Sequence, residues 1–221
     1  MIVLTIDQQG SRRIGDRVEQ LLSDLDRHLA RDGSRAPVRA FERTVGDEVQ
    51  GVLDDADLAV DLVLAVLRWG GWSVGVGCGR VDLPLPDTSR AGSGPAFVLA
   101  RAAVERAKAR SGSVAAAVVG EQSVAASDAE AVLTLMGAVA GRRTPAGWQV
   151  IDALHDAGVG ARQEDVAMAL GITQQAVSQR LRTALWAEEM AARPLLGRLL
   201  VAAGGGPRAD EPPPARTDVA S

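Results

Sequence analysis

Apolar and polar positions along the first 120 residues follow two patterns, one typical of strands and one typical of helices. Short continuous or alternating apolar runs predict strands, and apolar positions repeated every third or fourth residue predict amphipathic helices. The predicted strands are residues 2–6, 38–44, 48–53, 72–81 and 114–119, the second and third joined as a hairpin. The predicted helices are residues 16–31, 57–69 and 95–109.

The order strand, helix, hairpin, helix, strand, helix, strand predicts a sheet with helices packed mainly on one face. It is close to the β-α-β-β-α-β plan of ferredoxin-like folds. In the predicted strand 72–81, glycine alternates with small apolar residues at Gly75, Gly77 and Gly79. Glycine inside a strand indicates close approach of other backbone, so we expect a helix or another chain to pack there.

Residues 161–187 carry two short helical patterns separated by a tight turn. Gly171 follows the first pattern, where a residue free to adopt positive φ is needed. Thr173 has the position and the side chain of an N-cap, and Val177 and Leu181 then begin a new apolar face. Two helices joined in this way predict a helix-turn-helix.

The second of these helices leaves amide, hydroxyl and guanidinium groups outward, and such groups bind base edges and phosphates of DNA. The segment resembles the helix-turn-helix of bacterial regulators and of the promoter-reading domain of sigma factors. The alternative is an ordinary corner between two helices. If this helix reads DNA, four of its side chains are expected to face base edges: Gln174, Gln175, Ser178 and Gln179. Three others are expected mainly to hold phosphates: Thr173, Arg180 and Arg182.

The composition shifts after Gly120, and the chain divides into four parts. Residues 1–122 hold the predicted sheet, and residues 123–143 hold a connecting helix at 128–140 and a linker. Residues 144–203 form the predicted DNA-binding domain, whose first helix, 145–157, turns Trp148, Ile151 and Leu154 to its core. Residues 204–221 are rich in glycine, proline and charge, which predicts a disordered tail.

The last predicted helix, residues 187–202, carries a stripe of apolar residues between Met190 and Leu200. Pro194 is expected to kink this helix or to restart it. The stripe suits a core or a dimer interface. We favour the interface and expect a homodimer, because a two-fold pair doubles the few DNA contacts of one helix-turn-helix.

Length and composition restrict the class of protein. The 221 residues allow one large or two modest domains. No apolar run of about 18 residues without charge is present, so no membrane span is expected. No secretory leader is recognisable at the N-terminus. Cys78 is the one cysteine, which suits a cytoplasmic protein. Arginine supplies nearly all the positive charge, and this bias suggests a GC-rich bacterial genome.

The net charge of −4 contrasts with the basic footprint usual for DNA-binding proteins. Any basic patch must therefore be local. Its candidates are Arg142, Arg143, Arg162, Arg180 and Arg182. Acidic residues close in sequence dilute this patch, so we expect DNA binding that is modest, salt-sensitive and dependent on dimerisation.

Two aspartates follow predicted strand ends that lie side by side in the expected plan. Asp7 ends the first strand, and Asp47 lies at the tip of the hairpin. Two carboxylates within a few ångströms either share Mg²⁺ with a triphosphate or raise one another's pKa. The alternative is structural: Asp47 shapes the hairpin turn, and Asp7 caps the segment after its strand.

Residues 1–120 resemble the SatD family of bacterial proteins in four segments: TIDQQGSRR (5–13), VGDEVQGVL (45–53), VGVGCG (74–79) and GPAFVLAR (94–101). The same order of segments resembles, more distantly, the catalytic domain of class III nucleotidyl cyclases. That resemblance implies metal-binding roles for Asp7 and Asp47. It also implies nucleotide contacts from Arg43 and Arg101.

The cyclase pattern is incomplete, since Phe97 stands where cyclases carry an asparagine that stabilises the transition state. Phenylalanine cannot donate a hydrogen bond there, and losing one such donor typically costs about 10²–10³ in rate. The resemblance therefore implies a catalytically degenerate domain that serves dimerisation and ligand sensing, with Mg²⁺ and a nucleotide as the candidate ligands.

Together these patterns predict an α+β chain: a ferredoxin-like or nucleotidyl cyclase-like N-terminal α/β sandwich followed by an all-α helix-turn-helix domain. We expect a cytoplasmic, homodimeric transcription regulator that binds double-stranded DNA, has no membrane partner and is not an enzyme. One alternative is a metal-dependent nucleotide cyclase or nucleotidyltransferase with a helical regulatory domain. Another is a protein–protein adaptor that has lost DNA binding.

Overall fold

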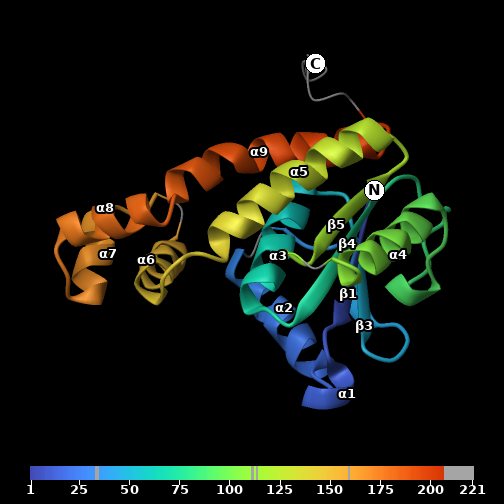
Figure 1. The fold of residues 1–221 in the computed structure, drawn as a ribbon, viewed down its shortest axis with the longest axis horizontal. Helices are drawn as coiled ribbons and strands as arrows, with labels where there is room; N and C mark the ends of the chain where they lie inside the picture. Colours follow the sequence, from blue (N-terminus) through green and yellow to red (C-terminus); the bar gives the residue numbers. More distant parts are fainter. Residues whose placement is uncertain (33–34, 111, 113, 159, 207–221) are drawn as a thin grey trace, which may run out of the picture.

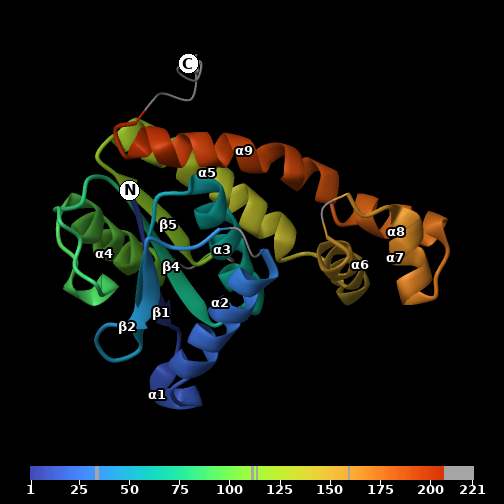
Figure 2. The ribbon, with the colours of Figure 1, turned by 180° about the vertical axis from the view of Figure 1, so that it is seen from behind.

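The computed structural model describes residues 1–32, 35–110, 112, 114–158 and 160–206. Within them, five strands form one sheet in the order β2-β3-β1-β4-β5 (Figures 1 and 2). The strands are β1 (Ile2–Gln8), β2 (Arg39–Arg43), β3 (Glu48–Leu53), β4 (Trp72–Cys78) and β5 (Ala116–Gly120). β1 is antiparallel to both of its neighbours, and β5 is parallel to β4.

Helices cover both faces of the sheet, so the expectation of helices mainly on one face fails for α4 (Pro95–Lys108). The short α1 (Ser11–Ile14) follows β1, and then come α2 (Val18–Asp32), α3 (Ala56–Trp69) and α4. α2 and α3 pack with the main apolar core on one face, and α4 packs against the opposite face of β1, β4 and β5. The predicted order of elements is confirmed, and the chain is an α+β protein.

The predicted close approach at the glycines of β4 is confirmed, and the element that approaches is α4. A Cβ added at Gly75 would lie 2.3 Å from the backbone nitrogen of Val104. A Cβ added at Gly77 would lie 2.3 Å from the backbone nitrogen of Ala100. Backbone atoms of a helix cannot move aside as a side chain can, so these two positions require glycine.

Two predicted boundaries differ from the structure by more than two residues. β4 ends at Cys78 rather than at residue 81. The helix expected at 128–140 begins at Ser123 and forms α5 (Ser123–Ala140). Its first turn contributes Ala126 to the main core, and this burial against distant parts of the chain has no local sequence signal.

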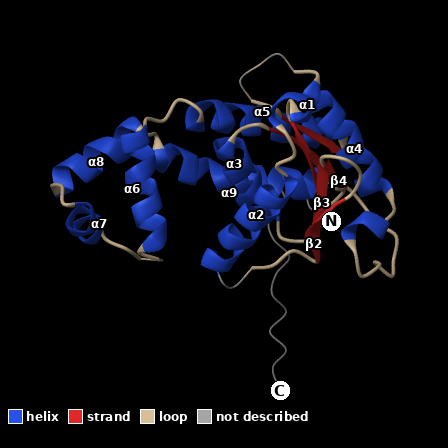
Figure 3. Cartoon of the chain, turned by 90° about the horizontal axis from the view of Figure 1, so that it is seen from below, coloured by secondary structure: helices blue, strands red, loops and turns tan. Residues whose placement is uncertain are grey.

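Three short helices form a group of their own beyond α5: α6 (Pro145–Asp156), α7 (Gln163–Leu170) and α8 (Gln174–Thr183) (Figure 3). They share a separate small core built from Val150, Val166, Ala167 and Val177. Residue 159, in the connection between α6 and α7, lies outside the described residues. This group holds the predicted two-helix turn away from the sheet.

The last helix, α9 (Trp186–Ala203), runs back from this group beside α5 toward the sheet (Figures 1 and 2). Leu196, Leu199 and Leu200 are buried in the main core, where α9 packs against α3 and α5. The expectation of a dimer interface is therefore wrong for these three leucines, whereas Met190 and Leu195 of the same stripe are exposed. Pro194 lies inside one continuous helix, so the predicted restart is also wrong.

Residues 207–221 of the predicted tail lie outside the described residues. The backbone N–H groups of Gly204, Gly205 and Gly206 donate hydrogen bonds to carbonyls in the last turn of α9.

Among the described helices, α5 is the one long and apolar enough to cross a membrane. It carries Asp128 and Glu130, and the buried Glu130 carboxylate accepts hydrogen bonds from Arg106 (2.9 Å) and Arg110 (2.7 Å). It also packs against α9 and β5. These contacts make α5 part of the fold, which is consistent with a soluble protein.

Candidate nucleic-acid interface and the carboxylate edge of the sheet

The turn between α7 and α8 has the local geometry that its sequence predicts. Gly171 adopts φ 63° and ψ 34°, a left-handed conformation that ends α7. The Thr173 hydroxyl accepts a hydrogen bond from the backbone N–H of Ala176 at 3.1 Å and caps α8. Both expectations are confirmed, and together they fix the direction in which α8 leaves the turn.

α8 buries one side and leaves its amide-rich side in solvent. Val177 is fully buried in the small core of α6, α7 and α8. Five of the predicted contact residues are exposed, and these are Thr173, Gln174, Gln175, Gln179 and Arg182. Ser178 and Arg180 are half-buried. A helix about 10 Å wide with such a face has the shape and the chemistry that a major groove admits.

The arginines predicted for a basic patch divide into two groups. Arg143 is 1% exposed and forms an ion pair with Glu189 at 2.7 Å, so its assignment to the patch is wrong. Arg162 pairs with Glu164 at 3.2 Å, and Arg180 donates to the Gln149 side chain at 3.0 Å. Arg142 and Arg182 are exposed, and their side chains have no partner among the described residues. The cationic surface is therefore small.

Trp148 and Asp152 of α6 join the three-helix group to the end of α3. The Arg68 guanidinium lies 3.9 Å from the centre of the Trp148 ring. It also donates two hydrogen bonds to the Asp152 carboxylate, at 2.5 and 2.7 Å. Trp148 was expected in the core of the helical domain, but it packs at this junction instead, because the planar guanidinium of Arg68 stacks on it.

A second set of contacts at the junction is buried and charged. Arg193 of α9 donates to Asp61 of α3 at 2.8 Å and to Glu189 at 2.8 Å. The other Asp61 oxygen lies 2.7 Å from His28 Nε2 of α2. Burial alone would raise the pKa of Asp61, but the hydrogen bonds from His28 and Arg193 hold that pKa well below its ordinary value.

Sequence reasoning missed the contacts of these junction residues, including those of Arg143, which it assigned to a basic patch. His28, Asp61, Arg143 and Arg193 come from four distant segments, and no spacing within the sequence relates them. Their signal exists only in the fold, as charged side chains that are mostly buried and therefore need partners.

At the other end of the molecule, the structure brings the two predicted aspartates to the same edge of the sheet. The backbone N–H of Gln8 donates to the Asp47 carbonyl at 3.2 Å. The pKa of Asp7 is raised, chiefly by burial and also by the nearby charges of Asp47 and Glu48. Lys108 of α4 opposes this rise through a hydrogen bond to the Asp7 carboxylate at 3.3 Å.

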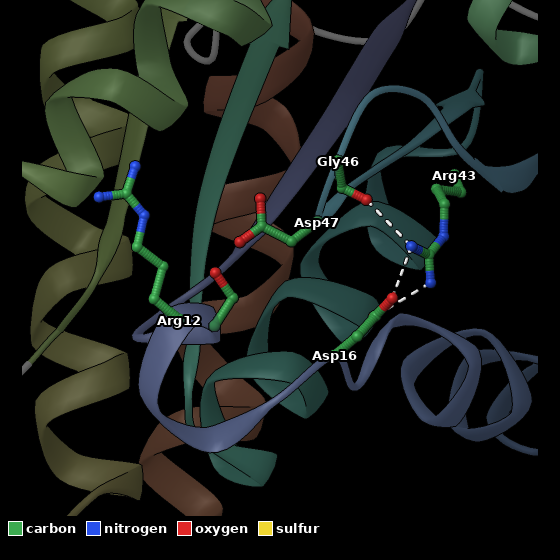
Figure 4. Close-up of a pocket in the computed structure, with 6 residues that line it drawn as sticks. Arg12, Asp16, Arg43, Gly46 and Asp47 are labelled. Carbon is green, nitrogen blue, oxygen red and sulfur yellow. Dashed lines mark hydrogen bonds and ion pairs between the residues drawn. The ribbon is translucent and has the colours of Figure 1, made fainter.

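Asp47 also lines a shallow pocket of about 450 Å³ with Ser11, Arg12, Asp16, Arg43 and Gly46 (Figure 4). The two predicted nucleotide contacts are engaged within the chain. Arg43 donates to Asp16 at 2.7 and 3.0 Å, and these hydrogen bonds raise the pKa of Arg43. Arg101, which is largely exposed, lies 3.9 Å from Glu48.

The fit of this edge to Mg²⁺ is poor. Lys108 already supplies the positive charge beside Asp7. The described residues contain no group of three or more histidine, cysteine, aspartate or glutamate side chains that could hold a metal ion. Phe97 is buried against Val3 and Val52, so it belongs to the packing under α4.

Comparisons with known proteins find no match to this chain among family models, curated proteins or solved structures.

Proposed function

We propose that this protein is a DNA-binding transcription regulator of the cytoplasm that acts as a homodimer. The observation that carries the proposal is α8 itself. It follows a left-handed glycine and a threonine cap, and it leaves Gln174, Gln175 and Gln179 bare to solvent. Amides at successive turns suit the paired donor and acceptor pattern that adenine shows in the major groove.

In this proposal the α7–turn–α8 segment is a helix-turn-helix and α8 is its recognition helix. Gln174, Gln175, Ser178 and Gln179 face base edges, and Thr173 and Arg182 hold phosphates. Arg180 needs to exchange its hydrogen bond with Gln149 for a phosphate, which a surface arginine does at low cost. The small cationic surface limits the electrostatic part of binding, so one domain alone binds weakly.

The N-terminal domain is proposed to be a SatD-like, distantly cyclase-like sandwich with a ferredoxin-like core, used for dimerisation and ligand sensing. The order β2-β3-β1-β4 with β1 antiparallel to both neighbours supports this plan. A nucleotide is the candidate ligand for the edge near Asp47. Incubation with ATP or GTP and Mg²⁺ or Mn²⁺ should release no product, and metal-dependent product that disappears in Asp47→Ala would favour the enzyme instead.

The test of DNA binding is selection of duplexes from a random library by the full-length protein. The wild type is expected to enrich a palindromic sequence, and the double variant Gln174→Ala/Gln175→Ala is expected to lose the enrichment. The matched control is Gln20→Ala/Gln122→Ala, which removes two amides from surfaces far from α8 in the sequence. No enriched sequence and no band shift on genomic fragments at low salt would favour a protein–protein adaptor.

A further inference from the structure

The outer face of α5 is apolar and uncovered. The composition of α5 would suit a membrane span, and 39% of its residues are buried inside the protein. Val124 is 75% exposed and Leu135 is 68% exposed. Asp128 and Ala131 lie between them on the same stripe and are also exposed. An apolar stripe of this length left in water indicates a missing partner.

α9 has a comparable outer face. Its leucines at 196, 199 and 200 are buried in the core, and its exposed large apolar residues are Met190, Leu195 and Val201. Pro194 and Arg198 lie on the same side and are exposed. α9 therefore exposes a second apolar stripe beside the first, with Arg198 near its middle and Glu188 at its edge, two turns before Leu195.

The two stripes run antiparallel in a register that hydrogen bonds fix at both ends. The Gln122 backbone N–H donates to the Ala203 carbonyl at 2.9 Å, and Arg143 Nε donates to the Ala184 carbonyl at 2.8 Å. Equal rises along the two helices then place Asp128 level with Arg198 and Val124 level with Val201. Neither Asp128 nor Arg198 has a partner among the described residues.

We propose that a second copy of this chain covers the outer face of the α5–α9 pair, about a two-fold axis parallel to these helices. The inference builds on the dimer in the proposed function but requires no DNA. The axis sets α5 against α9 of the second copy. Asp128 then meets Arg198 of the second copy twice, and apolar ends meet apolar ends in a four-helix arrangement.

The charges of Asp128 and Arg198 distinguish this axis from a two-fold axis perpendicular to the helices. An axis perpendicular to the helices would set α5 against α5, with Asp128 near Leu135 of the second copy and Arg198 facing α9. Each charge would then be buried without a partner, which is costly. The parallel axis pairs Asp128 with Arg198 of the second copy twice and is self-complementary.

The same axis has a consequence for DNA. The group of α6, α7 and α8 lies at one end of the α5–α9 pair (Figure 1). Rotation about an axis parallel to the pair leaves both groups at the same end, where two copies of α8 can face one duplex. A palindromic site requires this arrangement, whereas the perpendicular axis would place the two groups at opposite ends.

Sedimentation velocity over a range of protein concentrations tests the surface on the full chain without DNA. The wild type is expected to form dimers, and Leu135→Glu is expected to be monomeric. The control is Leu83→Glu, because Leu83 is 79% exposed in the loop after β4 and should leave the dimer intact. Circular dichroism of each variant checks that the chain still folds.

A charge exchange provides the sharper test. Asp128→Arg and Arg198→Asp are each expected to weaken the dimer by about 10-fold or more, because each places like charges together. The double variant D128R/R198D restores the pairs and should regain the wild-type dimer. A wild type that stays monomeric, or a double variant no stronger than the single ones, would overturn the proposal.

The alternative partner for the outer face of the α5–α9 pair is a lipid membrane. Charges in the middle of both stripes disfavour it. Flotation of the wild type with anionic vesicles, lost in Leu135→Glu, would overturn the dimer in favour of membrane binding. A protein that dimerises but enriches no DNA sequence in the selection experiment would support this dimer surface and contradict the proposed DNA binding.

Discussion

At the scale of single residues, the Asp61 carboxylate is held by side chains of two other helices. It accepts from Arg193 of α9 and lies against His28 of α2, so one carboxylate joins three helices. Arg193 in turn contacts Glu189. Charged groups this far from water are stable only as a set, and removing one leaves the others without a partner.

Asp61→Asn should therefore destabilise the fold by about 3–5 kcal/mol in urea unfolding at neutral pH. The control is Glu164→Gln, which removes an exposed ion pair with Arg162 and should cost about 0–1 kcal/mol. An equal loss of unfolding free energy in both variants would contradict a larger contribution from the buried charges around Asp61.

The pH dependence of this loss follows from the lowered pKa of Asp61. A carboxylate whose folded pKa lies below its unfolded value stabilises the fold above the unfolded pKa. That contribution is lost as pH falls through the window between the unfolded value, about 3.9, and the lower folded one. The difference in unfolding free energy between wild type and Asp61→Asn should thus be full at neutral pH and shrink below about pH 4.

Variants of Arg182 and Gln175 distinguish phosphate binding from base reading by α8. Arg182→Ala should weaken binding to all duplexes alike and lower the slope of log affinity against log salt by about one. Gln175→Ala should instead relax the preference at one base pair by about 1–3 kcal/mol. Fluorescence anisotropy at several salt concentrations measures both, with Arg27→Ala on α2 as the control. Identical effects of Arg182→Ala and Arg27→Ala would contradict the assignment.

At the scale of elements, the sequence predicts best what is decided locally. The left-handed Gly171 and the Thr173 cap follow from neighbouring residues, and both are found. The glycines of β4 predict a close neighbour but cannot tell which one. The sequence does not tell that Leu196, Leu199 and Leu200 of α9 are core residues, because their burial depends on α3 and α5, which are distant in the chain.

Gly77→Ala tests the contact between β4 and α4. The new methyl group would meet the Ala100 backbone at 2.3 Å, so α4 must shift away from the sheet. We expect a loss of about 1–3 kcal/mol or more in urea unfolding. Gly112→Ala is the control, since a Cβ there meets nothing within 4 Å. Equal stability of the two variants would contradict the close packing.

At the scale of the whole molecule, the candidate site could be predicted only in part. The exposed face of α8 follows from helical periodicity. The edge with Asp7 and Asp47 follows from the order of strands, but its ion pair with Lys108 joins residues 101 positions apart. The junction of α6 and α9 with α2 and α3 likewise needs the fold. This junction links the proposed sensing domain to the proposed DNA reader through buried charge rather than through a loose linker.

The central claim is that the bare side of α8 enters a groove of DNA. Amide hydrogen exchange of the full-length protein, with and without a selected duplex, tests it directly. DNA is expected to slow exchange in the segment from Thr173 to Arg182 and to leave exchange in β2 and β3 unchanged. Slower exchange elsewhere, with this segment unaffected by a bound duplex, would contradict it.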